Sequence, residues 1–152
     1  MTDSSLLEQL NRYYNLWRES TLMYEEWSKR RGLSYNSVMV LYSIVEAPDT
    51  CTQKKIHEKW LLPKQTINTI LKEFERRDLI TLSPLPTDKR NKLIHPTASG
   101  QEYAQKIISD LRELELYVLE TLGLERVSHM NRDLSLFIEL FHKGEEMQHA
   151  QT

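Results

Sequence analysis

The chain has 152 residues and a formal net charge of −2, from 20 Lys and Arg against 22 Asp and Glu. This length fits one domain, alone or with helical extensions, and a hydrophobic fraction of 39% is too high for a disordered chain. The longest uncharged stretch, which ends at Val45, falls well short of the roughly 18 to 20 residues that a membrane span needs. Taken as a whole, the charge argues mildly against a nucleic-acid partner.

The start of the chain and its cysteine content indicate a cytoplasmic protein. Residues 1–5 contain no basic region followed by an apolar one, so no secretion signal is predicted. A lone cysteine, Cys51, rules out an internal disulfide and is compatible with a reducing compartment. We therefore expect a cytoplasmic protein with no membrane partner.

The first predicted element is a long helix over residues 5–31. The chain has only four glycines, which flank or interrupt long runs rich in Leu, Glu, Lys and Arg and so favour helices. Its apolar positions follow a heptad-like spacing, at Leu6, Leu10, Tyr13, Trp17, Tyr24 and Trp27. A small domain alone does not normally cover an apolar stripe of this length, so we expect the helix to pack on another chain.

Two shorter helices are predicted next. Ser34 can cap a helix over residues 35–46. Two threonines, Thr50 and Thr52, can cap the next helix, a short one that ends at Trp60, and Thr50 and Gln53 have the spacing of a capping box.

A fourth helix, a β-hairpin and two long helices complete the predicted order. The helix over residues 64–77 has one apolar face, formed by Ile67, Ile70, Leu71 and Phe74. Residues 79–82 and 92–95 are predicted strands, and residues 83–91 between them form a proline-stiffened basic loop. The last two helices are predicted over residues 98–121 and 124–143.

This order of elements is that of a winged helix-turn-helix. On a helical wheel, five polar or basic residues lie opposite the apolar face of the fourth helix: Gln65, Asn68, Thr69, Lys72 and Arg76. Gln and Asn can pair with adenine, Thr can contact a thymine methyl group, and Lys and Arg can reach guanine or phosphate. The alternative is a merely solvated helix face, but the basic hairpin that follows favours DNA.

The charge is segregated along the chain. Residues 53–92 carry ten basic and five acidic side chains, a local charge of +5. The remainder carries ten basic and 17 acidic side chains, a charge of −7. The near-neutral total therefore hides an electropositive surface over the predicted DNA-binding elements.

Two segments carry a family resemblance. Residues 62–71 read LPKQTINTIL and residues 84–100 read PLPTDKRNKLIHPTASG. The first resembles the recognition helix, and the second the wing, of the MarR (multiple antibiotic resistance regulator) family of transcription factors. The wing pattern of that family is P-x-P-x-D-[RK]-R, a strand, L-T and a Gly two residues later. With weaker matches at residues 32–34 and 52–56, motifs cover residues 32–100, and the flanks match by helix layout.

Four positions depart from the family pattern. Pro96 stands where leucine is usual, which predicts an early end of the second wing strand. His57 replaces a small residue, which predicts altered packing between the two motif helices. Asp78 replaces a helix-ending glycine and tolerates the left-handed conformation needed there. Thr69 stands where arginine is common, which bears on base preference rather than on DNA binding.

The resemblance implies a MarR-like protomer over residues 1–152 that forms a homodimer and binds a pseudo-palindromic double-stranded operator. Its parts would be an N-terminal dimerisation helix at residues 5–32, a winged helix-turn-helix lobe at 34–97 and C-terminal dimerisation helices at 98–147. The expected protein is a repressor, released from DNA by a small-molecule effector.

The recognition helix would then enter the major groove and the wing the minor groove. The expected DNA-binding residues are Lys64, Gln65, Thr66, Asn68, Thr69, Lys72, Arg76, Asp88, Lys89, Arg90 and Lys92. We expect Arg90 to insert into the minor groove, because a narrow minor groove concentrates negative potential. Asp88 is expected to orient the wing rather than to contact DNA.

Two features bear on regulation. Seven of the 13 aromatic residues lie between Tyr13 and Tyr42. One interpretation is a pocket for an aromatic or lipophilic effector, lined by Tyr13, Trp17, Tyr24 and Tyr42; the simpler one is packing at a dimer interface. Cys51 lies near a helix N-terminus, which would lower its thiol pKa and permit redox sensing, although an inert buried thiol is the simpler interpretation.

Catalytic and metal-binding functions find little support. His142, Glu145, Glu146 and His149 form two i, i+4 pairs with a spacing that can hold a metal, but a frayed, solvated terminus explains them better. Glycine-rich phosphate loops, G-x-S-x-G and H-E-x-x-H are absent from the sequence. We therefore expect no enzyme, cofactor or metal. The alternative function is a winged-helix module that binds protein, or nucleic acid without sequence choice.

Overall fold

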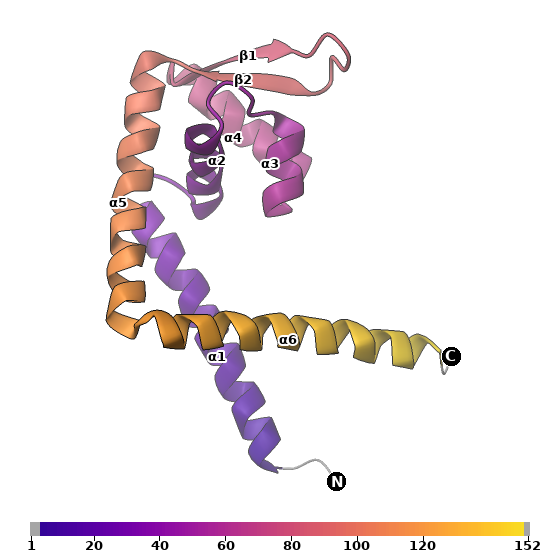
Figure 1. Ribbon diagram of the computed structural model, residues 1–152. Coiled ribbons are helices and arrows are strands. Elements are labelled where there is room, and N and C mark those ends of the chain that lie inside the picture. The colour runs from indigo at the N-terminus through magenta and orange to yellow at the C-terminus, as the bar shows by residue number, and fades with distance from the viewer. Residues whose placement is uncertain (1–3, 151–152) are drawn as a thin grey trace. The chain divides into compact units, whose positions relative to one another are not determined.

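The structure, a computed structural model, describes residues 4–150. Its elements in chain order are α1 (Ser4–Lys29), α2 (Tyr35–Glu46), α3 (Gln53–Trp60), α4 (Lys64–Arg76), β1 (Ile80–Pro84), β2 (Lys92–Pro96), α5 (Ala98–Leu122) and α6 (Leu124–His149) (Figure 1). They form two compact units that divide after Ile108, within α5. The expected fold class, mainly helical with a small β wing, is confirmed.

Two side-chain caps begin α2 and α3. Ser34 Oγ accepts a hydrogen bond of 3.1 Å from the backbone N–H of Ser37, as its position predicts. At α3 the cap is Thr52, whose Oγ1 accepts from the N–H of Lys55 at 3.2 Å. Of the two threonine caps that the sequence offers, Thr52 is therefore confirmed, and the capping-box pairing of Thr50 with Gln53 is wrong because the helix begins at Gln53 itself.

A left-handed residue and two hydrogen bonds define the turn between α3 and α4. Leu61 ends α3 in the left-handed conformation, with φ of 54°, and its N–H donates to the carbonyl oxygen of His57 at 2.9 Å. The Nδ1 atom of His57 lies 2.6 Å from the carbonyl oxygen of Leu62. The histidine that departs from the family pattern thus hydrogen-bonds to the turn itself. After α4, Asp78 adopts the expected left-handed conformation, with φ of 55°.

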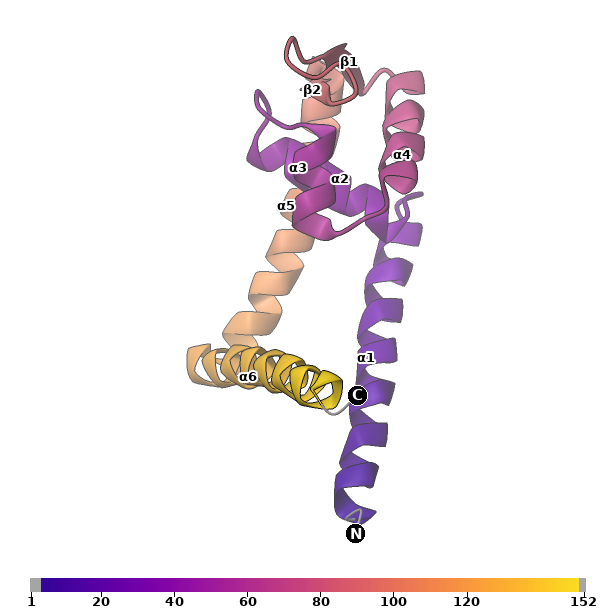
Figure 2. The same ribbon diagram turned by 90° about the vertical axis from the view of Figure 1, so that its right-hand side faces the viewer.

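The first unit has a hydrophobic core built from the winged-helix elements. Its most buried side chains include Val38, Leu41, Ile56, Ile67, Leu71, Phe74, Ile94 and Ile108, each at most 1% exposed. They come from α2, α3, α4, β2 and α5. Packing of these side chains holds α2, α3 and α4 together beneath the hairpin of β1 and β2 (Figure 2). All four residues predicted to form the apolar face of α4 are buried, so that prediction is confirmed.

The wing is an antiparallel pair in which Ile80 lies opposite Pro96 and Pro84 opposite Lys92. The strand β2 includes Pro96, so the expected early end of the strand is wrong. The backbone N–H of Thr97 donates to the carbonyl oxygen of Leu79 at 3.0 Å. Because hydrogen-bonded and non-bonded pairs alternate, Ile80 and Pro96 form a non-bonded pair that needs no N–H from proline.

The second unit contains the end of α5 and all of α6. No residue of α6 is buried, and Leu134, Phe137, Ile138 and Phe141 are 44–59% exposed. The helix continues to His149, beyond the predicted end at residue 143, so the expected frayed terminus is wrong for this stretch. No helix among residues 4–150 is long and apolar enough to cross a membrane.

Candidate nucleic-acid interface

The outer face of α4 carries the predicted contact residues. Opposite the buried Ile67 and Phe74, the structure exposes polar and basic side chains to solvent. Lys64, Gln65, Thr69, Lys72 and Arg76 are exposed, and Thr66 and Asn68 are half-buried at the edges of this face. A face of this composition, on the second helix of a helix-turn-helix, can enter a major groove and read base edges.

Two of these side chains have partners on their own helix. Arg76 donates to both carboxylate oxygens of Glu73, from Nε at 2.9 Å and from Nη2 at 2.6 Å. This fork lowers the pKa of Glu73 and raises that of Arg76, because the hydrogen bonds favour both charged forms. Thr69 Oγ1 donates to the carbonyl oxygen of Gln65 at 3.0 Å, which leaves its methyl group as the part available for an apolar contact.

The wing loop is shaped by hydrogen bonds around Asp88. Its Oδ1 accepts from the backbone N–H of Arg90 at 3.1 Å, and its carbonyl oxygen accepts from the N–H of Asn91 at 3.1 Å. Lys89 and Arg90 are exposed, and Lys92 is half-buried at the start of β2. The Asp88 carboxylate therefore orients the loop through the Arg90 backbone, and the basic side chains extend from a defined turn.

The base of the wing is attached to the segment before α3. Thr52 forms a β-bridge with Leu93, and the N–H of Ile94 donates to the carbonyl oxygen of Cys51 at 2.9 Å. Further out, Asn91 Oδ1 accepts from the backbone N–H of Lys54 at 3.1 Å. Sequence reasoning missed these contacts, because they join segments about 40 residues apart and no short motif encodes them.

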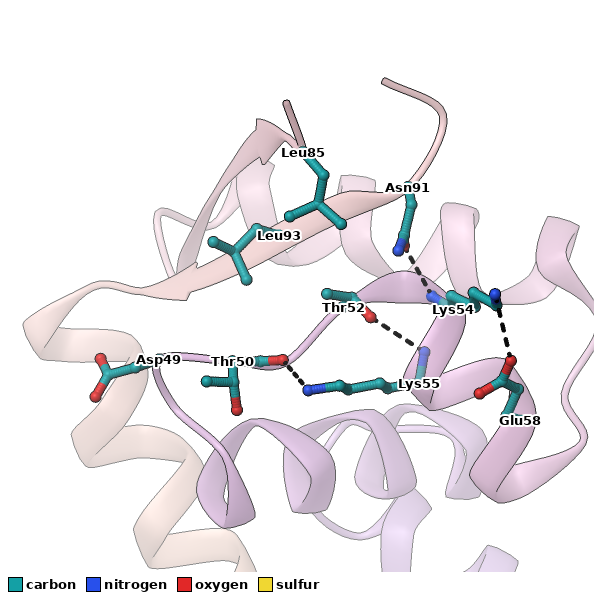
Figure 3. A pocket seen from close by; sticks show the side chains of 9 residues that line it. All are labelled: Asp49, Thr50, Thr52, Lys54, Lys55, Glu58, Leu85, Asn91 and Leu93. Carbon is teal, nitrogen blue, oxygen red and sulfur yellow. Dashed lines mark hydrogen bonds and ion pairs between the residues drawn. The ribbon is translucent and has the colours of Figure 1, made fainter. Parts of the chain in front are cut away.

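A groove of about 540 Å³ lies between the wing and the start of α3 (Figure 3). Its lining residues are Asp49, Thr50, Thr52, Lys54, Lys55, Glu58, Leu85, Asn91 and Leu93. Most of its charged groups have partners: Lys55 Nζ donates to the carbonyl oxygen of Thr50 at 2.9 Å, and Lys54 lies 3.8 Å from Glu58. The wing leucines form the apolar wall, and the Asn91–Lys54 hydrogen bond joins the two sides.

The four aromatic residues predicted to line an effector pocket each lie near another aromatic ring. Tyr13 packs against Trp17, with ring centroids 6.3 Å apart, and Trp17 is 59% exposed. Tyr24 packs against Tyr35 at 5.0 Å. Tyr42 makes an edge-on contact with Trp60 at 5.6 Å, and the Lys59 ammonium lies 5.1 Å from each of these two ring centroids.

Cys51 is a buried thiol with a raised pKa. Its side chain is 2% exposed, and burial raises the pKa of the thiol from 9.0 to about 11, against the smaller lowering effects of Lys55 and Lys59. The helix N-terminus does not produce the low pKa that redox sensing requires. The effect of burial on the pKa exceeds that of the two lysines. The backbone carbonyl oxygen of Cys51 accepts a hydrogen bond from the N–H of Ile94 in the wing.

Two of the candidate metal ligands near the C-terminus contact each other. His142 Nδ1 lies 3.2 Å from Glu145 Oε2, and both side chains are exposed. Among residues 4–150 no group of three or more His, Cys, Asp or Glu side chains is arranged to hold a metal ion.

Fold and site together define a winged helix-turn-helix protein, and comparisons with known proteins refine this class. The model of the MarR family matches residues 31–91. The solved structure of NMB1585, a MarR family regulator from Neisseria meningitidis, is 30% identical, with a TM-score of 0.74, over 94% of this chain and 98% of that chain. The HTH-type transcriptional regulator SarZ of Staphylococcus epidermidis is 25% identical over 83% of each chain. The MepR–DNA complex of Staphylococcus aureus shares the fold, with 22% identity and a TM-score of 0.71, over 84% of this chain and 96% of that chain.

The chain belongs to the MarR family of DNA-binding transcriptional regulators. The resemblance read from the wing and recognition-helix motifs is thereby confirmed, and so is the conclusion that the protein is not an enzyme.

Proposed function

We propose that the protein is a homodimeric, sequence-specific regulator that inserts α4 into the major groove and the wing into the flanking minor groove of an operator. One observation carries this proposal: the exposed polar face of α4 and the basic wing loop belong to the same compact unit, within the segment of charge +5. Together the polar face of α4 and the Lys89-Arg90 pair form the kind of basic, hydrogen-bonding surface that supports DNA as the partner.

The side chains divide by their chemistry into base-reading and phosphate-binding sets. Gln65 and Asn68 are suited to bidentate pairing with adenine, and Thr66 and Thr69 to contact with thymine methyl groups. Lys64, Lys72 and Arg76 are suited to phosphate or guanine, as is Lys92 in the wing. Arg90 is the proposed minor-groove side chain, and Asp88 acts by shaping the loop.

Exposed apolar side chains on α1 and α6 support dimerisation. On α6, Leu134, Phe137, Ile138 and Phe141 follow the spacing of one helix face and are 44–59% exposed. On α1, Leu6, Leu16, Trp17 and Met23 are 54–67% exposed. A second copy of the chain would bury these residues. Sedimentation equilibrium would yield twice the chain mass, and a monomer at micromolar concentration would contradict the dimer.

We further propose that the regulator is a repressor that an aromatic or lipophilic molecule releases from DNA. The half-buried rings of Tyr13, Tyr24 and Tyr42 along α1 and α2 support this proposal. The ligand would need to bind better to a dimer whose recognition helices are misplaced. Tryptophan fluorescence titrated with a panel of phenols tests this, and no response across the panel would leave these rings with a packing role.

Binding to duplexes recovered from a random library tests the DNA-reading role of α4. Gln65→Ala should relax the preference at one position of each half-site and cost about 1 to 3 kcal/mol there. The control is Gln101→Ala, which removes an exposed glutamine from the first turn of α5. An unchanged base preference in the Gln65 variant would remove that residue from the readout, and no recovered preference for the wild type would favour a non-specific winged-helix module.

A further inference from the structure

The side chain of Asn91 connects the wing loop to the first turn of α3. Its Oδ1 accepts from the backbone N–H of Lys54 at 3.1 Å, across the mouth of the groove in Figure 3. The first N–H groups of a helix have no partner within it and need external acceptors. Thr52 supplies one such acceptor locally, to Lys55, and Asn91 supplies another from a segment 37 residues away.

The wing has a second attachment at its base, and the two attachments constrain different motions. The Thr52–Leu93 bridge and the Ile94–Cys51 hydrogen bond fix the middle of β2. These contacts, like the Thr97–Leu79 hydrogen bond, hold the base and middle of the hairpin, so on their own they would still let the loop end turn away from α3. The Asn91–Lys54 bond fixes a second point, next to the basic residues of the loop, and removes this rotation.

The backbone of Asn91 transmits this constraint to the loop. The N–H of Leu85 donates to the carbonyl oxygen of Asn91 at 3.2 Å, and the N–H of Asn91 donates to the carbonyl oxygen of Asp88 at 3.1 Å. Arg90 precedes Asn91 directly, and its own N–H is bound by Asp88. The loop is therefore a closed unit whose position relative to α3 is set by the Asn91 side chain.

We propose that Asn91 is a positioning residue for DNA binding, which holds the wing loop at a fixed place relative to α3 so that Arg90 and α4 engage DNA together. The inference rests on the proposed function, because it requires the wing to contact DNA. Asn91 itself need not contact DNA, since its Oδ1 is already bound to Lys54.

A double-mutant cycle with the minor-groove arginine tests the proposal. In the wild type, Arg90→Ala should weaken operator binding about 5- to 150-fold. In an Asn91→Ala background the same change should cost less than about 2-fold, because the loop no longer holds Arg90 against DNA. Asn91→Asp keeps the acceptor oxygen, so in that background Arg90→Ala should retain a cost close to the wild-type one.

Thr52→Ala is the matched control, because it removes the other side-chain acceptor from the same turn of α3 without cutting the link to the wing. In that background Arg90→Ala should keep its full cost. The positioning role is wrong if Arg90→Ala weakens operator binding equally in the wild type and in the Asn91→Ala background. It is also wrong if the Thr52→Ala background abolishes the effect of Arg90→Ala as fully as Asn91→Ala does.

Amide hydrogen exchange gives a readout that does not depend on DNA. Asn91→Ala should speed exchange at the Lys54 amide at least about tenfold, and Thr52→Ala should act on Lys55 instead. Unchanged exchange at Lys54 would overturn the link between wing and helix. If Arg90→Ala has no effect in the wild type, the wing contact of the proposed function is wrong and the positioning role falls with it, whereas equal costs in both backgrounds overturn the positioning role alone.

Discussion

A Cβ atom at Gly100 would lie 1.7 Å from the carbonyl oxygen of Leu79. This close approach brings the first turn of α5 against the end of the helix-to-wing turn. Around it, Thr97 Oγ1 donates to the carbonyl oxygen of Asp78 at 2.6 Å and accepts from the Gly100 N–H at 3.0 Å. The glycine of the wing motif is therefore a packing requirement that fixes where α5 leaves the wing.

Gly100→Ala should lower the free energy of unfolding by about 3 kcal/mol, because a backbone carbonyl must move to accept the methyl group. Urea unfolding at a fixed protein concentration measures this loss. The control is Gly144→Ala in α6, where nothing lies within 4 Å of the added Cβ, so helix propensity should raise stability by about 0.5 to 1 kcal/mol. Equal stability of the Gly100 variant and the wild type would contradict the close approach.

Leu61→Gly should stabilise the protein by about 1 kcal/mol. Leu61 holds a left-handed conformation with φ of 54°, and its side chain is 82% exposed, so its removal relieves strain at little loss of packing. Asp78→Gly, at a similar φ of 55°, should gain less, because aspartate tolerates this conformation. Thermal melting of the two variants checks the order, and destabilisation by Leu61→Gly would show that this leucine has a partner.

Within this fold, local features were predictable from sequence and long-range ones were not. Because Ile67 and Phe74 are spaced two helical turns apart, they lie on one face of α4, which is buried. The polar residues between them therefore lie on the opposite face. The Ser34 cap and the left-handed Asp78 also depend on adjacent residues alone. These predictions are confirmed because no distant part of the chain decides them.

Contacts between distant segments decided the features that sequence reasoning missed. Pro96 stays within β2 because the pairing register places it at a non-bonded position, which its own residue type does not reveal. The partner of Asn91 lies 37 residues away. Tyr42 lies in the same aromatic-rich segment as Tyr13 but packs on Trp60 of α3, a partner that the density of aromatics along the chain does not reveal.

Cys51 should resist thiol reagents in the native state. With its pKa raised from 9.0 to about 11, the thiolate fraction at pH 8 falls about 100-fold relative to the unfolded chain, and burial adds to this protection. Ellman's reagent should therefore react at least about 100-fold more slowly than in urea. Peroxide should leave operator binding intact, and loss of binding on peroxide treatment that Cys51→Ser prevents would contradict an inert thiol.

The same pKa shift predicts a pH dependence of stability. The folded state keeps the Cys51 proton at a pH where the unfolded chain has lost it, so this contribution is fully present below pH 9 and is lost as the pH rises towards 11. Over that window the wild type should lose more stability than Cys51→Ser. Parallel losses in the two proteins would show that the thiol is not protected by burial.

Arg90→Ala should weaken operator binding by about 1 to 3 kcal/mol and reduce the slope of log affinity against log salt by about one unit. Arg90 is exposed on the wing loop, and its side chain is the proposed minor-groove contact. Arg30→Ala on α1 removes the same charge from a side chain that lies 4.0 Å from Glu26, and should leave both quantities unchanged. Equal effects of the two variants on affinity and salt slope would show that Arg90 contributes only to the net charge of the protein and makes no specific contact.

Binding selection from random duplexes tests most directly the claim that a dimer of this chain reads DNA with α4 and the wing. The account predicts a pseudo-palindromic consensus whose half-sites lie about one helical turn apart, since two recognition helices enter successive major grooves on one face of the duplex. Recovery of duplexes with no shared sequence, or of a single half-site without its symmetric copy, would contradict it.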